Sequence, residues 1–196
     1  MDSKNLTRMM IETAVARGIK DMSDDPKRAL RRLADMGRQF STGRFQPRII
    51  EIIQGLLQNE DSPYYQLISD SLETTDHEAI KRFGINIGYN CWTYSARIIR
   101  QESARRGYCI PWILFFEYSQ ELAAGSQNNE NVLTIDRIRN IIKQALPLGV
   151  NAFCILQRGR SIADKGLLEL FTEYPDSAFF CLLETASLSA AQMTRF

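Results

Sequence analysis

Two hydrophobic patterns divide the chain near residue 107. Before that point apolar residues recur every three or four positions, which predicts amphipathic helices. Five helices are expected, beginning near Asp2 or Ser3, at Pro26, at Gln46, at Pro63 and at His77. Gly18 is expected to end the first helix, because glycine commonly follows a helix C-terminus. That helix is expected to carry Leu6, Met9, Met10, Ala14 and Val15 on one face.

The fifth predicted helix, from His77 to about Arg106, has an unusual composition. Gly84 and Gly88 lie inside it, although a glycine in a helix costs about 1 kcal/mol relative to alanine. Asn86 lies between the two glycines, and Asn90 follows Gly88 one helical turn after Asn86. We favour a buried helix with polar tethers that packs closely on a neighbour. Two alternatives stay open: the Asn amides line a binding site, or a short strand forms at Gly84–Gly88.

Short apolar runs alternate with helical patterns after residue 107. The runs predict three strands, at Ile110–Phe116, Ala152–Leu156 and Ala178–Leu183. Helices are expected between them, at Thr134–Leu148 and from Ser161 to Phe171. This order with short connections is typical of a parallel sheet with right-handed crossovers. The first run is continuous, which is typical of a strand covered on both faces.

The predicted fold class is α/β, or α+β for the chain as a whole. A helical region at residues 1–107 is followed by a βαβαβ unit with a three-stranded parallel sheet at residues 108–196. Three strands cannot close a barrel. We therefore expect an open sheet, the equivalent of a half-barrel fragment, with a short helix at Leu188–Phe196 covering it.

Composition and charge exclude several classes of protein. Of the 196 residues 44% are hydrophobic, which is enough for a buried core. The net charge of +1 argues against nucleic-acid binding through bulk charge. The longest apolar runs are strand-sized and the first ten residues lack the apolar core of a signal peptide, so no membrane segment is expected.

Four cysteines and one histidine make a poor set of metal ligands. The cysteines, at positions 91, 109, 154 and 181, have no regular spacing, so we expect reduced, mostly buried thiols in a cytoplasmic protein. His77 stands at a predicted helix start, where a solvated side chain is the favoured interpretation. We predict no metal ligand and no catalytic residue.

The best candidate site follows the predicted strands at their carboxyl ends. Arg158, Gly159, Arg160 and Ser161 lie between the second strand and the next helix. A helix N-terminus favours anions, and ligands of open α/β sheets bind at this edge. The acids that follow the other two strands would face the same edge; they are Glu117 and Glu184. An anion or a small ligand is therefore predicted here, although such loops also occur without a ligand.

The order of these segments resembles the start of a group of radical S-adenosylmethionine enzymes. The resemblance covers a little over half of the chain. It rests on Phe83–Trp92, on the Pro-Trp pair at positions 111 and 112, on the strand at Ile113–Glu117, on Thr134–Leu156 and on Gly166–Asp176. It implies a partial (β/α) barrel whose strand ends hold an iron–sulfur cluster and S-adenosylmethionine.

The motifs that would hold these cofactors are missing. The loop at Tyr118–Asn131, equivalent to the three-cysteine cluster loop of that group, has no cysteine. Gln157–Ser161 stands in place of Gly-Gly-Glu-Pro, and Glu184–Ser187 in place of Thr-Asn-Gly. The resemblance therefore implies a truncated, degenerate relative that has lost both the iron–sulfur cluster and S-adenosylmethionine.

A non-catalytic binding or regulatory protein is the function that we expect from these features. It would act through a protein partner or as a homo-oligomer, without membrane or nucleic acid. The alternative is an enzyme-like domain that binds a small molecule or anion at the strand ends. The sequence leaves open the ligand, the partner and whether another chain completes the barrel.

Overall fold

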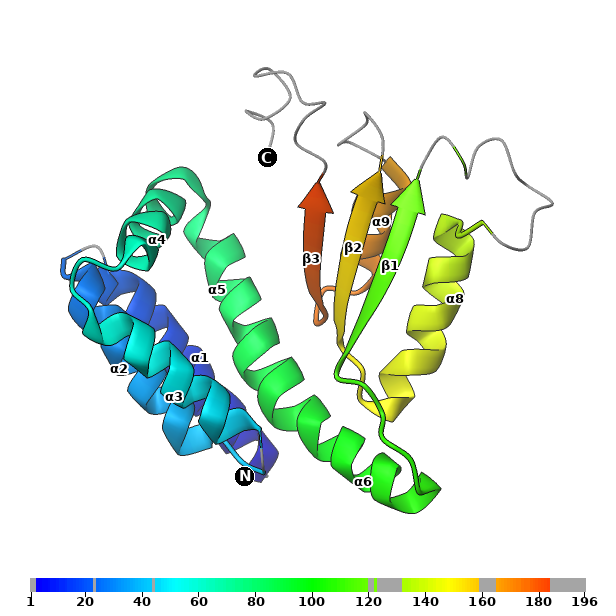
Figure 1. Ribbon diagram of the computed structural model, residues 1–196, viewed down its shortest axis with the longest axis horizontal. Helices are drawn as coiled ribbons and strands as arrows, with labels where there is room; N and C mark the ends of the chain where they lie inside the picture. Colours follow the sequence, from blue (N-terminus) through cyan, green and yellow to red (C-terminus); the bar gives the residue numbers. More distant parts are fainter. Residues whose placement is uncertain are drawn as a thin grey trace. The chain divides into compact units, whose positions relative to one another are not determined.

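A computed structural model shows a mostly helical chain with one three-stranded parallel sheet, as the sequence predicts (Figure 1). It describes residues 3–22, 24–43, 45–119, 122, 132–158 and 165–183. The chain divides into two units, residues 1–93 and 94–196, and each is described by itself. The change of hydrophobic pattern near residue 107 lies later than this division, because the last part of the long helical segment packs with the sheet unit.

The first unit consists of consecutive helices that begin where the sequence signals place them. They are α1 (Ser3–Met22), α2 (Pro26–Phe40), α3 (Gln46–Gln58), α4 (Pro63–Thr74), α5 (His77–Ile85) and the start of a π-helix, η1 (Asn86–Ser95). Asp25 and Asp76 cap α2 and α5, and their carboxylates accept backbone N–H bonds of 3.0 and 2.9 Å. Each cap satisfies a donor that the first helical turn leaves unpaired.

One prediction for the first helix is wrong. Gly18 does not end α1, which runs on to Met22. A Cβ at Gly18 would lie 2.8 Å from the Leu33 side chain, so glycine serves the close approach of α1 and α2 rather than a helix stop. On the predicted apolar face, about half of the surface of Leu6, Met9 and Met10 is exposed.

The helical segment from residue 77 to residue 106 has no break, so the alternative of a strand at Gly84–Gly88 is wrong. It passes from α5 through η1 into α6 (Ala96–Arg106). The predicted close packing is present, since a Cβ at Gly84 would lie 2.8 Å from Val15 Cγ1 of α1. The ten-residue π-helix in the middle was not predicted.

The second unit is built from three parallel strands in the order β1-β2-β3. After α6 come β1 (Ile113–Ser119), α8 (Ile135–Ala145), the short 3₁₀ helix η2 (Leu146–Leu148), β2 (Ala152–Arg158), α9 (Lys165–Glu173) and β3 (Ala178–Leu183). The third strand has the predicted bounds. The first begins three residues later than predicted, beyond Pro111, which has no N–H for the ladder.

One face of the sheet forms the core of this unit. Phe116, Phe153 and Ile155 of the strands pack against α8 and α9, whose inward residues are Ile138, Ile142, Leu167 and Leu170. The connections from β1 to β2 and from β2 to β3 cross the sheet in the same direction. Because such crossovers are right-handed, their helices α8 and α9 lie on the same face of the sheet (Figure 1). The prediction that the first strand is covered on both faces is therefore wrong: Phe115 is 65% exposed.

Cysteine burial agrees with expectation only in part. Cys91 and Cys154 are buried, whereas Cys109 and Cys181 are exposed. The predicted C-terminal helix at Leu188–Phe196 and the start of the predicted helix at Ser161 lie outside the described residues.

Candidate functional site

Two of the predicted site residues meet near the carboxyl end of the sheet. Glu117 of β1 and Arg158 of β2 lie on neighbouring strands, and Arg158 Nε donates to Glu117 Oε1 at 3.0 Å. Both side chains are more than half exposed. Gly159, Arg160, Ser161 and Glu184 lie outside the described residues, so the rest of the predicted edge is not part of this description.

The ion pair changes what this edge can bind. Because the Arg158 guanidinium already faces a carboxylate, an incoming anion would have to compete with Glu117. An exposed pair of this kind gains little energy and is screened by salt. The described half of the edge therefore presents a neutral pair of opposite charges rather than a positive pocket.

Apolar side chains surround this pair on the face of the sheet opposite α8 and α9. The register sets Phe115, Cys154 and Phe180 in one row across the strands and Glu117, Leu156 and Leu182 in the next. We call this surface the open face and define it by Phe115, Glu117, Leu156, Arg158, Phe180 and Leu182. Leu182 is 56% exposed, so both edge strands present a large apolar side chain. Parallel sheets are normally covered on both faces, and exposed apolar patches often mark interaction sites.

The predicted Asn pair belongs to the first unit and lies inside η1. Asn86 and Asn90 are both buried, and Asn90 Nδ2 donates to Asn86 Oδ1 at 2.9 Å. Thr93 Oγ1 donates to the Gly88 carbonyl at 2.8 Å in the same segment. These bonds are those of a polar tether within a buried helix. They agree with the interpretation that the sequence favours over a binding role.

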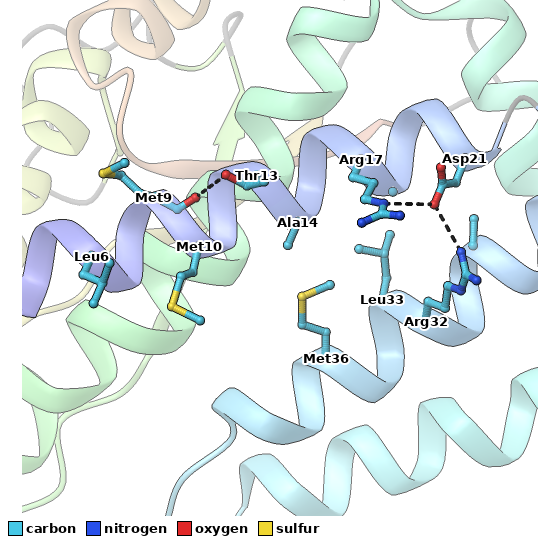
Figure 2. Close-up of a pocket in the computed structure, with 12 residues that line it drawn as sticks. Leu6, Met9, Met10, Thr13, Ala14, Arg17, Asp21, Arg32, Leu33 and Met36 are labelled. Carbon is cyan, nitrogen blue, oxygen red and sulfur yellow. Dashed lines mark hydrogen bonds and ion pairs between the residues drawn. The ribbon is translucent and has the colours of Figure 1, made fainter.

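A groove between α1 and α2 was missed by sequence reasoning (Figure 2). It encloses about 600 Å³, with thioethers and aliphatic side chains along most of its length. Arg17 and Arg32 both approach Asp21 at one end, at 3.8 and 3.4 Å. The apolar positions of the two helices were visible in the sequence, but not that three methionines on them would line a groove, because this depends on how α1 packs on α2. These methionines are Met9, Met10 and Met36.

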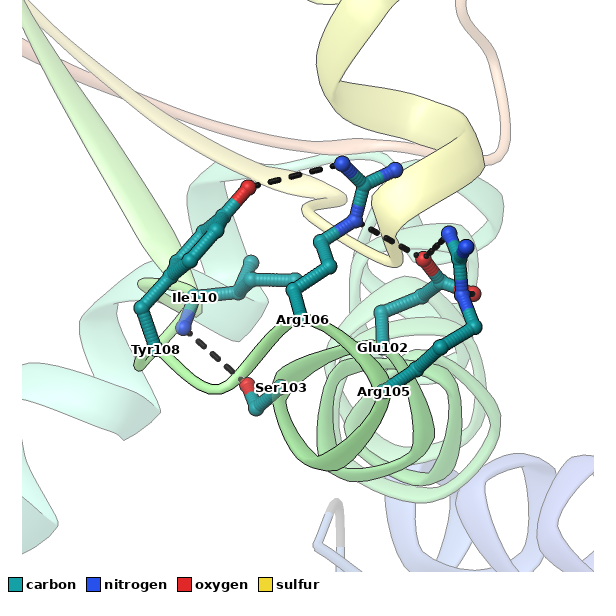
Figure 3. A network of polar contacts seen from close by, with 6 residues as sticks. All are labelled: Glu102, Ser103, Arg105, Arg106, Tyr108 and Ile110. Carbon is teal, nitrogen blue, oxygen red and sulfur yellow. Dashed lines mark hydrogen bonds and ion pairs between the residues drawn. The ribbon is translucent and has the colours of Figure 1, made fainter.

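A polar cluster at the end of α6 has a structural role (Figure 3). Glu102 accepts hydrogen bonds from Arg105 and Arg106, and these guanidinium groups hold the pKa of its carboxyl below the ordinary value. Ser103 Oγ accepts the Ile110 N–H at 3.1 Å, beyond the left-handed turn at Gly107. The cluster fixes the chain between α6 and β1.

In residues 3–183, apart from the gaps given above, no three His, Cys, Asp or Glu side chains are grouped so that they could hold a metal ion. No helix within the same described ranges has both the length and the apolar composition needed to cross a bilayer.

The likeness of the chain to known proteins was tested in three ways. No protein-family model matches the chain, and neither does any curated protein or solved structure. The resemblance to radical S-adenosylmethionine enzymes therefore stays a prediction from the residues quoted for it.

Proposed function

We propose that this is a non-catalytic binding protein that self-associates through the open face of its sheet. The observation that carries the proposal comes from the described residues of the parallel sheet and its helices: α8 and α9 pack on one face, while Phe115 and Leu182 stand exposed on the other. Full burial of a large apolar side chain gains about 1.5–3 kcal/mol. A few such contacts on each copy supply a substantial driving force for association.

A second copy is the occupant that the charges favour. Of the six residues that define the open face, Glu117 is the one acid, Arg158 is the one base and the other four are apolar. In a two-fold dimer the same patch meets itself, so the patch must be self-complementary. A neutral apolar surface with one charge of each sign meets this condition, because each Glu117 can approach an Arg158 of the other copy. A surface of one sign would repel itself.

The resemblance to radical S-adenosylmethionine enzymes supports the same proposal. In a (β/α) barrel the helices form an outer ring and the strands face a packed interior. A segment of such a wall would have helices on one face and an apolar second face that needs cover. We infer that the protein is a degenerate, cytoplasmic relative without cluster or S-adenosylmethionine, in which association takes the place of barrel closure.

Light scattering on the full chain and two variants tests this function. We expect the wild type to exceed the monomer mass of 22.5 kDa and Phe115→Glu to return it to the monomer. Leu168→Glu is the matched control, because Leu168 is also about half exposed but lies on α9, which packs against the other face. It should leave the mass unchanged. A monomeric wild type, or equal effects of the two variants, would overturn the proposal, and circular dichroism checks that each variant is folded.

A further inference from the structure

The groove between α1 and α2 is open to solvent along α1. Its lining on this helix extends from Leu6 to Asp21, which corresponds to about 22 Å of helix. Five of the lining residues on α1 are exposed: Leu6, Met9, Met10, Thr13 and Arg17. A small-molecule pocket buries most of its ligand, whereas a long, open apolar groove accommodates one face of an amphipathic helix. The shape therefore favours a helix as the occupant.

Close packing of the two helices and a set of methionines define this groove. A Cβ at Gly18 would lie 2.8 Å from the Leu33 side chain, so α1 and α2 are in contact there. In Figure 2, Met10 points from α1 and Met36 points from α2 into the space between the helices. Because thioether side chains change conformation easily, methionines adapt to apolar partners of different shape. The methionines thus form an adaptable apolar surface beside a fixed helix–helix contact.

The charged side chains of the groove carry a surplus of one positive charge. They are Arg17, Asp21 and Arg32. Both guanidinium groups approach the same carboxylate oxygen, Asp21 Oδ2, at 3.8 and 3.4 Å. Each guanidinium has five N–H donors, so one shared oxygen cannot satisfy them all. The side chains of Arg17 and Arg32 are 78% and 51% exposed, so a second carboxylate can reach both.

We propose that this groove binds an acidic amphipathic helix of another protein. The apolar side chains of that helix recur at helical spacing and pack on Leu6, Met10 and Met36. A glutamate or aspartate beside its apolar stripe accepts hydrogen bonds from Arg17 and Arg32. The apolar contacts supply most of the affinity, and the charges supply the preference for an acidic partner. This site lies in the first unit and does not involve the open face.

Two peptides of about 15 residues, a length that matches the groove, test the proposal. Both carry leucines at helical spacing; one has glutamates beside the leucines at both ends, and the other has lysines in their place. Fluorescence anisotropy with the full chain should show that the glutamate peptide binds about tenfold more tightly at low salt. The difference should shrink at high salt, because exposed charges are screened.

Charge variants distinguish pairing in the groove from attraction by the chain as a whole. Arg17→Glu/Arg32→Glu should reverse the preference, so that the lysine peptide binds more tightly. Arg48→Glu/Arg97→Glu is the matched control, because both arginines are exposed and lie outside the groove; it should keep the preference for glutamate. Asp21→Asn should strengthen binding of the glutamate peptide alone, since it frees both guanidinium groups from their shared carboxylate.

An apolar variant shows whether the peptides occupy the groove. Met10→Gln/Met36→Gln should weaken both peptides at least about tenfold, because it removes apolar contacts and no charge. Leu67→Gln is the control, since Leu67 is exposed on α4 outside the groove; it should leave both affinities unchanged. Circular dichroism checks that each variant is folded.

Several outcomes would overturn the proposal. They are no binding of the glutamate peptide, equal binding of both peptides by the wild type, and a preference that Arg17→Glu/Arg32→Glu leaves intact. Sodium dodecanoate is the probe for a small amphiphile: its binding, lost in Met10→Gln/Met36→Gln while neither peptide binds, would assign the groove to such a ligand instead. A mass in light scattering that falls with Arg17→Glu/Arg32→Glu would place a second copy in the groove. Phe115→Glu, which tests the open face, should bind the glutamate peptide as the wild type does, so the two proposals can fail independently.

Discussion

Arg158 Nε lies 3.0 Å from Oε1 of Glu117, on the neighbouring parallel strand. The two residues are 41 positions apart in the chain and meet only because β1 and β2 pair in register. Their contact makes the charged part of the open face neutral. The proposed self-association depends on this neutrality, because two copies of a face with charge of one sign would repel each other.

Charge reversal at this pair tests the neutrality directly. Glu117→Arg puts two positive charges on each open face, so two copies repel, and we expect the dimer to dissociate most strongly at low salt. The double variant Glu117→Arg/Arg158→Glu restores one charge of each sign and should restore the dimer. Sedimentation velocity at low and high salt measures both. A double variant that stays as dissociated as the single one would contradict the argument from charge.

Gly149 is expected to be intolerant of a side chain. Its φ is 86°, and a Cβ there would lie 2.8 Å from the Ser95 carbonyl oxygen. Gly149→Ala should therefore lower the free energy of unfolding by about 3 kcal/mol, from the left-handed backbone and the contact together. Gly107, at φ 76° with open space around it, is the matched control. Gly107→Ala should cost about 1–2 kcal/mol in urea denaturation; equal losses would refute the role of the contact.

Two helical glycines of the first unit should respond in opposite directions. A Cβ at Gly84 would lie 2.8 Å from Cγ1 of Val15, and a valine side chain in a helix has little freedom to move. Gly84→Ala should lower the free energy of unfolding by about 1–3 kcal/mol. Gly55 has no atom within 4 Å of its would-be Cβ, so Gly55→Ala should raise it by about 0.5–1 kcal/mol. Thermal denaturation separates the two, and shifts of the same sign would count against the packing of α5 on α1.

Cys181 should react with thiol reagents more slowly than its exposure suggests. Desolvation, with a smaller effect of Cys154, raises the pKa of its thiol from 9.0 to about 11. Since the thiolate is the reactive form, this rise in the pKa lowers the thiolate fraction near neutral pH about 100-fold. In Cys109→Ser, which removes the other exposed thiol, we expect the rate with Ellman's reagent to keep rising up to about pH 11. A plateau near pH 9 would show an unperturbed thiol.

Local signals made much of the secondary structure predictable. Asp25-Pro26 and Asp76 mark helix starts because their carboxylates cap N–H groups within the next turn, and this chemistry depends on nearby residues alone. The third strand was predicted with its observed bounds, Ala178–Leu183, since turn residues precede it. These features need no knowledge of the tertiary structure.

Features that depend on distant partners were not predictable in the same way. The apolar run that contains Phe115 is compatible with a strand covered on one face and with a strand covered on both. Which of the two occurs depends on the strand order, and this order puts α8 and α9 on the same face of the sheet. Gly18 resembles a helix stop, although its actual partner is Leu33 on the next helix. For the site, the sequence brought Glu117 and Arg158 to one edge but could not show that they pair, and it did not indicate that Arg17 and Arg32 both approach Asp21.

Hydroxyl-radical footprinting of the full chain at low and high protein concentration tests self-association through the open face most directly. The account predicts that Phe115 and Leu182 are oxidised readily in dilute solution and become protected as concentration rises. Leu168, exposed on α9, should react equally at both concentrations. Phe115 and Leu182 that react alike at both concentrations, whether always protected or always accessible, would contradict it.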